Sequence, residues 1–141
     1  MLRNLFITAL VFVSAMTAGA ALAQSNKQAA EIIAKSLLEA KGPVETRPTL
    51  DPGLFAAVPQ IAQTYQIARE MPRELDKQFC YCYCSVNPSF RHKSLLTCYT
   101  DGHAAQCGIC MREAVETSEL TKQGKSPAEI AAYFKAKYVQ Q

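Results

Sequence analysis

All six cysteines of the 141-residue chain lie between residues 80 and 110, and this crowding is the strongest constraint on its fold. Three of them alternate with tyrosine in the run Cys80-Tyr81-Cys82-Tyr83-Cys84. The other three are Cys98, Cys107 and Cys110. A disulfide frame, a redox couple and a metal thiolate site all use cysteine, but each demands a different geometry.

The alternation of cysteine with tyrosine predicts a short extended segment, because tyrosine favours strands. In an extended chain, alternate side chains share a face about 6.5 Å apart. Such a spacing suits several thiolates that converge on metal ions. A disulfide inside a Cys-x-Cys run would instead require a small ring, which the narrow geometry of the bond disfavours.

A helix predicted from Gly102 to about Lys122 places His103, Cys107 and Cys110 on one face, at i, i+4 and i+7. Asp101 is the expected N-cap of this helix. The positive end of the helix would lower the pKa of a thiol and favour the thiolate that a metal needs.

The sequence therefore predicts one sulfur-rich metal site, with soft Cu(I) as the first candidate ion and Zn(II) and Hg(II) as competitors. His92 and Met111 lie nearby and offer a second imidazole and a thioether, but we interpret them first as a hydrogen-bonding residue and a core residue. Tyr81 and Tyr83 are expected to pack and shield the sulfurs. The candidate ligands are Cys80, Cys82, Cys84, Cys98, His103, Cys107 and Cys110.

Two other functions stay open at this point. An exported chain with an even number of cysteines is often a disulfide-stapled structural or interaction domain. A thiol-disulfide or peroxide-type oxidoreductase would use an exposed thiolate, Cys82 or Cys84, and a resolving neighbour. Six cysteines without an evident hierarchy favour a binding protein over an enzyme. Residue Met111 after Cys107-Gly108-Ile109-Cys110 excludes a c-type haem motif.

The N-terminus has the pattern of a secretory signal peptide over residues 1–23. Arg3 precedes an apolar run that ends in Ala21-Leu22-Ala23, which is an A-x-A cleavage pattern. We therefore expect an exported protein, periplasmic in location, without a membrane anchor after cleavage. A net charge of +3 without a basic stripe indicates no nucleic-acid partner. The expected partners are the metal ion and a metal-transfer or redox protein.

The remaining chain reads as all-α, a small bundle of four to five helices in which residues 80–84 form a loop or short extended segment packed on a helix hairpin. Residues 24–53 are predicted to be an N-terminal helix (25–41, capped by Ser25 or Asn26) and a Pro-rich linker that holds it loosely. Residues 54–141 are predicted to be the Cys-rich helical domain. Its helices are expected from about residue 55 to a break at Met71-Pro72, over 93–99, over 102–122 with a stop at Gly124, and from Ser126 onward.

The run CYCYC, followed by HKSLLTCYTDGHAAQCGICMREA and GKSPAEIAAYF, resembles small exported bacterial proteins with a PCYCGC or CYCXC motif. The resemblance covers roughly residues 60–141. Phe79 stands where the motif has proline, and Tyr83 stands where glycine is common. Some relatives carry selenocysteine within the motif, so the resemblance implies an exported cysteine-rich protein and adds weight to the redox alternative. It implies no catalytic residue.

Overall fold

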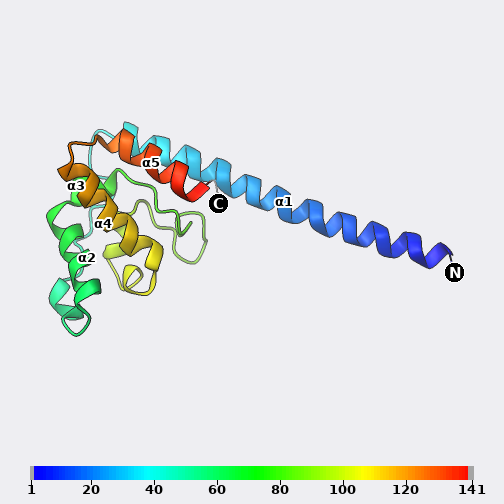
Figure 1. Cartoon of the computed structure of the whole chain (residues 1–141), viewed down its shortest axis with the longest axis horizontal. Helices are drawn as coiled ribbons and strands as arrows, with labels where there is room; N and C mark the ends of the chain where they lie inside the picture. Colours follow the sequence, from blue (N-terminus) through cyan, green and yellow to red (C-terminus); the bar gives the residue numbers. More distant parts are fainter. Residues whose placement is uncertain (1, 140–141) are drawn as a thin grey trace.

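A computed structural model describes residues 2–139, and the side chains of residues 20–139. Within these residues it contains five α-helices and three short 3-10 helices, and no strand. The chain is therefore all-α, as the sequence predicts (Figure 1). The α-helices are α1 (Leu2–Glu39), α2 (Pro59–Glu70), α3 (Pro72–Asp76), α4 (Gly108–Lys122) and α5 (Pro127–Val139), and the 3-10 helices are η1 (Pro52–Phe55), η2 (Leu96–Tyr99) and η3 (Ala104–Gln106).

Local signals account for most of the helix ends. Helices α2, α3 and α5 all begin at a proline, whose missing N–H costs nothing in the first turn. Ser126 and Glu129 form the predicted capping box of α5, since the Ser126 N–H donates to Glu129 (2.8 Å) and the Glu129 N–H to the Ser126 hydroxyl (3.3 Å). Gly124, at φ +82°, stops α4 as predicted.

The structure decides one alternative and corrects other local predictions. Residues 80–84 form a loop of turns, which is the first of the two predicted alternatives, and not an extended segment. Helix α4 begins at Gly108 instead of Gly102. The backbone of Cys107 is extended (φ −123°, ψ 102°), which separates η3 from α4. No helix starts at Ser25 or Asn26, because both residues lie inside α1.

The buried side chains form two cores. The first core contains four cysteines and lies among α2, α3, η2 and α4; its members are Tyr65, Ala68, Leu75, Cys80, Cys84, Leu95, Leu96, Cys98, Tyr99, Ala104, Cys110 and Ala114. The second core lies where the C-terminal part of α1 runs beside α5 (Figure 1); its members are Ala30, Leu37, Phe79, Tyr81, Ile130 and Phe134. Tyr133, which the helical pattern of α5 predicts as buried, is 41% exposed.

The Pro-rich segment after α1 is fastened to the body of the protein. The buried carboxylate of Asp76 accepts hydrogen bonds from the backbone N–H groups of Val44 (2.6 Å) and Glu45 (3.1 Å) and from the Ser94 hydroxyl (2.6 Å). Glu45 is buried in turn, and its carboxylate accepts from the Thr97 hydroxyl (2.9 Å). The segment and α1, whose Leu37 is buried, are thus held more firmly than the Pro-rich composition predicts.

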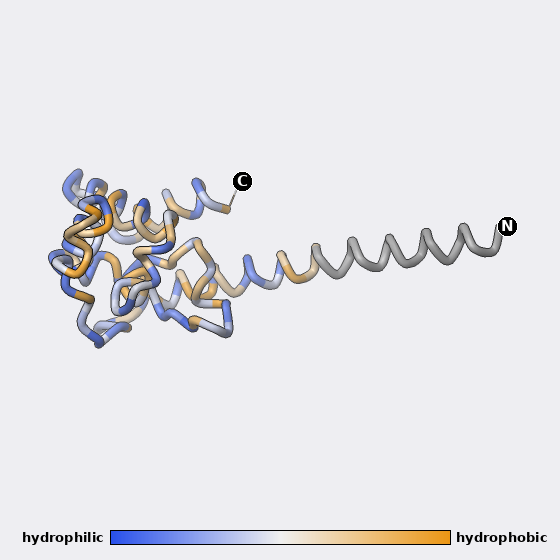
Figure 2. Tube along the Cα trace, turned by 90° about the horizontal axis from the view of Figure 1, so that it is seen from below, coloured by the Kyte–Doolittle hydropathy of each residue, from blue (hydrophilic) through white to orange (hydrophobic). Residues whose placement is uncertain are grey.

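Among the described residues, no helix has an apolar stretch long enough to cross a membrane. Figure 2 shows hydrophobic and hydrophilic residues interleaved along the coloured part of the trace. The signal peptide over residues 1–23 and the division into 24–53 and 54–141 remain predictions, and most of the first range lies where side chains are not described.

Glu45 generates a prediction about acid stability. Its pKa is lowered to about 2, chiefly because its carboxylate is hydrogen-bonded to the Arg47 guanidinium. A pKa below the ordinary 4.5 stabilises the folded protein fully above pH 4.5, and this contribution is lost as the pH falls toward 2. We expect Glu45→Gln to lower the free energy of unfolding by about 2 kcal/mol at pH 7 and by much less near pH 2.5. Urea titrations of metal-free protein at both pH values measure this.

The matched control is Glu39→Gln, which removes an exposed i,i+4 pair with Lys35. It should change the free energy of unfolding by less than about 0.5 kcal/mol at either pH. An equal loss for Glu45→Gln at both pH values would show that the carboxylate charge contributes nothing.

Candidate metal centre

Residues 79–84 lie between the two cores, and their side chains alternate between them. Cys80 and Cys84 belong to the first core, whereas Phe79 and Tyr81 belong to the second, against which Tyr83 also packs. The aromatic rings contact each other edge to face, with centroids 5.0 Å apart for Phe79 and Tyr81. The cysteines therefore share one side of the segment and the aromatic residues the other, as the alternation predicts, although the backbone is not a strand.

Turns bring the three sulfur atoms closer than an extended segment would. The Tyr83 N–H donates to the Cys80 carbonyl (3.1 Å), and Tyr83 has φ +61°, in the left-handed region. The sulfur atoms of Cys80 and Cys82 are 3.3 Å apart, and those of Cys80, Cys82 and Cys84 all lie within 4.8 Å of one another. The spacing of about 6.5 Å predicted for a strand is thus wrong.

A buried carboxyl group on α4 holds this segment in place. Oε1 of Glu113 accepts a hydrogen bond from the Tyr81 backbone N–H (2.9 Å), and the Glu113 side chain is completely buried. Burial raises the pKa of Glu113 to about 8. Sequence reasoning missed this residue, although its position one turn after Cys110 places it on the inward face of α4.

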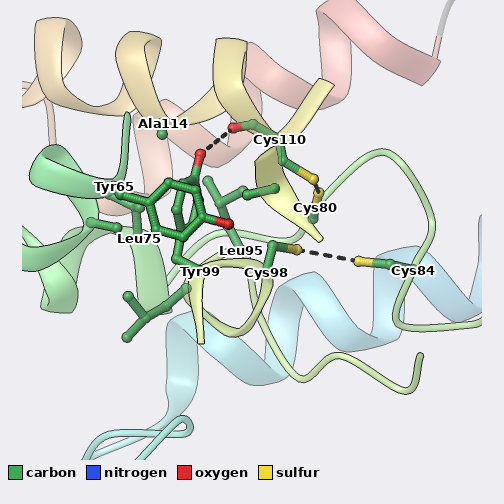
Figure 3. Close-up of a cluster of buried hydrophobic side chains, with 12 residues drawn as sticks. Tyr65, Leu75, Cys80, Cys84, Leu95, Cys98, Tyr99, Cys110 and Ala114 are labelled. Atoms are coloured by element: carbon green, nitrogen blue, oxygen red, sulfur yellow. Dashed lines mark hydrogen bonds between the residues drawn. The ribbon is translucent and has the colours of Figure 1, made fainter. Parts of the chain in front are cut away.

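The N-terminal end of α4 brings two further cysteines close to the sulfur atoms of residues 80–84. Cys107 is the N-cap residue, and Cys110 lies in the first turn, fully buried. The sulfur of Cys110 is 3.4 Å from that of Cys80 (Figure 3). It is 3.7 Å from that of Cys82. The Tyr99 hydroxyl donates to the Cys110 carbonyl (2.8 Å), which ties this turn to η2.

His103 reaches the cluster from outside α4. It precedes η3, so the prediction that His103, Cys107 and Cys110 share one helix face is wrong. The side chains nevertheless converge, because Nε2 of His103 is 3.6 Å from the sulfur of Cys82. The i, i+4, i+7 spacing of His103, Cys107 and Cys110 therefore does not come from one helix. The three residues lie before a 3-10 helix, at an extended residue and in the first turn of α4.

A second group of donors lies deeper in the protein. The sulfur of Cys98, on η2, is 3.5 Å from that of Cys84 and 3.3 Å from Nδ1 of His92 (Figure 3 shows the two cysteines). All three residues are buried. His92, which the sequence interpretation treats as a hydrogen-bonding residue, therefore faces the sulfur cluster.

Asp101 connects the two histidines. Its Oδ1 accepts the backbone N–H of His103 (2.8 Å), and its Oδ2 is 3.7 Å from Nε2 of His92. The Tyr65 hydroxyl donates to the Asp101 carbonyl (2.7 Å). Asp101, predicted to be a helix N-cap, therefore lies in a loop, where its carboxylate contacts the backbone of His103 and the imidazole ring of His92.

The arrangement is suited to hold a metal ion. All six cysteines are free, and four overlapping sets of cysteine and histidine donors have ligand atoms within 4.8 Å of one another. A tetrahedral ion with metal–sulfur bonds near 2.3 Å holds its sulfurs about 3.8 Å apart, close to the 3.3–3.7 Å found here. The sets are Cys82-His103-Cys107-Cys110, Cys84-His92-Cys98-His103, Cys80-Cys98-Cys110 and Cys80-Cys82-Cys84, so they contain all seven predicted ligands and add His92.

Exposure and pKa values differ across the cluster. Cys80 is buried, which raises the pKa of its thiol, whereas Cys82 is half-buried, and hydrogen bonds from Cys110 and Cys80 lower its pKa. The pKa of Cys84 is also lowered, to about 6, chiefly by a hydrogen bond with Cys80, so the metal-free cluster favours thiolates at Cys82 and Cys84. An incoming metal ion would displace the remaining protons, so that binding releases protons.

The left-handed backbone at Tyr83 yields a prediction about the motif. Glycine is the residue that the related motif commonly has here, and glycine adopts φ +61° without strain. We expect Tyr83→Gly to be more stable than Tyr83→Ala by about 1 kcal/mol, because both remove the ring but only glycine relieves the backbone. Chemical denaturation of the two metal-free variants measures the difference.

At Ser85, in the following turn, no positive φ is found, and Ser85→Gly and Ser85→Ala serve as the control pair. There alanine should equal or exceed glycine in stability. An alanine variant at position 83 as stable as the glycine variant would show that the turn carries no strain.

Comparison with known proteins supports the resemblance found in the sequence. A family model described as "Protein of unknown function with PCYCGC motif" matches residues 5–141. A search of curated proteins and a search of solved structures each returned no match. Since the family model spans nearly the whole chain, this protein belongs to the family with the PCYCGC motif.

Proposed function

We propose that this protein binds soft metal ions through its cysteine thiolates, outside the cytoplasm, and sequesters them or passes them to a partner protein. The observation that carries the proposal is the convergence of all six free cysteines with two histidines, from parts of the chain as far apart as Cys80 and Cys110. Four of these sulfurs are buried in the first core.

The composition of the donor sets favours Cu(I), with Zn(II) as an alternative ion. The four donor sets found among the described residues contain only cysteine and histidine. Thiolate and imidazole ligands suit Cu(I) and Zn(II), whereas Ca²⁺ and Mg²⁺ require oxygen ligands. Sulfur-rich sites with few imidazoles favour the softer of the two ions, which is Cu(I).

Transfer of the ion is supported by the partial exposure of the cluster. Cys82, His103 and Cys107 are half-buried, and His103 and Cys107 line a surface hollow of about 450 Å³ with Phe90, Asp101, Gly102 and Gln106. A thiol of a partner protein entering this hollow would meet the exposed edge of the metal site. The signal-peptide pattern of residues 1–23 supports a periplasmic location.

A direct test counts thiols and metal ions in the full chain, purified without oxygen. After removal of metal by a chelator, we expect six thiols that react with an alkylating reagent in denaturant. A second sample of the metal-free protein, kept folded, is given Cu(I) or Zn(II). The metal should protect its thiols from alkylation and remain bound after gel filtration, as measured by mass spectrometry. A protein that gains no metal and no thiol protection would contradict the proposal.

The variant pair Cys110→Ser and Cys82→Ser tests whether the cluster is the site. Both cysteines belong to the set that includes His103, and we expect each change to weaken binding at least about tenfold in competition with a chelator. Ser118→Ala, on the same helix as Cys110 but outside every donor set, should bind metal as the unmodified protein does.

Thiol–disulfide exchange is a second candidate function, favoured by the lowered pKa and partial exposure of Cys82. The Cys82 thiolate would attack a substrate disulfide and release a substrate thiol. Cys110, 3.7 Å away, would then displace the second substrate thiol and form a Cys82–Cys110 disulfide. Stoichiometric reduction of a disulfide substrate by the reduced, metal-free protein, with formation of a Cys82–Cys110 disulfide and loss of the reaction in Cys82→Ser, would favour this function over metal binding.

A further inference from the structure

The number and distribution of donors exceed what one metal ion can use. Six sulfurs and two imidazole rings take part in the donor sets, whereas a thiolate-bound Zn(II) ion takes four ligands. The donors also fall into two groups with little overlap. Cys82, His103, Cys107 and Cys110 form the outer group, and Cys84, His92 and Cys98, with His103 shared, form the inner group.

Cys80 lies between the two groups. It shares one donor set with Cys82 and Cys84 and another with Cys98 and Cys110, so that it is near members of both groups. Its sulfur is 3.4 Å from that of Cys110 and 3.3 Å from that of Cys82. A thiolate has more than one lone pair and bridges two ions when they flank it.

His92 is oriented as a metal ligand. Its Nδ1 faces the sulfur of Cys98 at 3.3 Å, and its Nε2 faces the carboxylate of Asp101 at 3.7 Å. An imidazole that binds a metal through one nitrogen usually directs the other N–H to a carboxylate, which fixes the tautomer and makes the ligand more basic. His92 has this arrangement while 5% exposed.

The two groups differ in access to solvent. Cys84, His92 and Cys98 are all buried, whereas Cys110 is the one buried donor of the outer group. Its other three donors, Cys82, His103 and Cys107, are half-buried, and His103 and Cys107 line the surface hollow described above. An ion in the outer group is therefore open to exchange, and an ion in the inner group is enclosed by protein.

We infer that the centre holds two soft metal ions in unequal positions, an exchangeable outer ion on Cys82, His103, Cys107 and Cys110 and an enclosed inner ion on Cys84, Cys98 and His92, with Cys80 between them. The inference rests on the proposed metal-binding function and adds its stoichiometry, a new ligand and an order of release. The outer ion is the one that a partner would take, and the inner ion stays with the protein.

Cadmium NMR of the full chain, titrated with ¹¹³Cd(II) alone, tests the inference. Two resonances and two bound ions per chain are expected. Cys107→Ser should move or abolish one resonance, and His92→Gln should move or abolish the other. A chelator added in small portions should remove first the resonance that Cys107→Ser affects.

Asp101→Asn gives a variant that disturbs the fold little. Asparagine keeps an oxygen that accepts the His103 N–H but removes the carboxylate behind His92. We expect an affinity about 10–100-fold lower for the inner ion alone. Circular dichroism of each metal-free variant checks that its helices remain.

The outcomes separate the two proposals. One resonance with one bound ion, or two resonances that His92→Gln leaves unchanged, would overturn the inference and leave metal binding intact. A chain that binds no cadmium would overturn both. Loss of the inner ion first under the chelator would reverse the assigned order and overturn the inference as well.

Discussion

The candidate metal centre depends on the way residues 79–84 are held between two cores. Phe79 and Tyr81 pack against α1 and α5 on one side, and Cys80 and Cys84 pack among α2, η2 and α4 on the other. The hydrogen bond from the Tyr81 N–H to the buried Glu113 fixes the segment to α4, the helix that carries Cys110. The aromatic side chains therefore orient the sulfur atoms, because they leave the cysteines only one side to occupy.

The buried cysteines contribute to the hydrophobic core independently of any metal ion. Free cysteine behaves as a small hydrophobic residue, and Cys80, Cys84, Cys98 and Cys110 contribute to the first core in that way. A metal ion that binds only the folded chain adds stability in proportion to its occupancy. In the function proposed above, the burial of most sulfurs would retain the metal, and the partial exposure of Cys82 would give a route for its exchange.

Local signals in the sequence predicted the helical class and many of the helix ends. Ser126 before α5, Pro127 at its start and Gly124 after α4 act on their immediate neighbours, so the sequence alone predicts these helix ends. Of the loop and the extended segment predicted as alternatives for residues 80–84, the loop is found, because tyrosine propensity is weak beside the packing of the two cores. The alternation of side chains nevertheless persisted, since it reflects where the rings and sulfurs are buried.

The candidate ligands were predictable by residue type but not by geometry. His103, Cys107 and Cys110 converge as expected, yet through a 3-10 turn and an extended residue that the helical spacing concealed. Glu113 was missed, and His92 was interpreted as a hydrogen-bonding residue before a ligand, because each acts through contacts with distant or non-helical parts of the chain that no spacing rule encodes.

The most direct measurement of this account is cross-linking of the metal-free, reduced protein with a short dithiol-reactive reagent. Cys82 and Cys107 are half-buried members of one donor set, and Arg91 and Lys93 allow trypsin to separate them into different peptides. If the two cysteine groups converge, mass spectrometry should find a Cys82–Cys107 cross-link in folded protein and not in urea. Cross-links confined to residues 80–84 and to Cys107–Cys110 would contradict the convergence of the two cysteine groups.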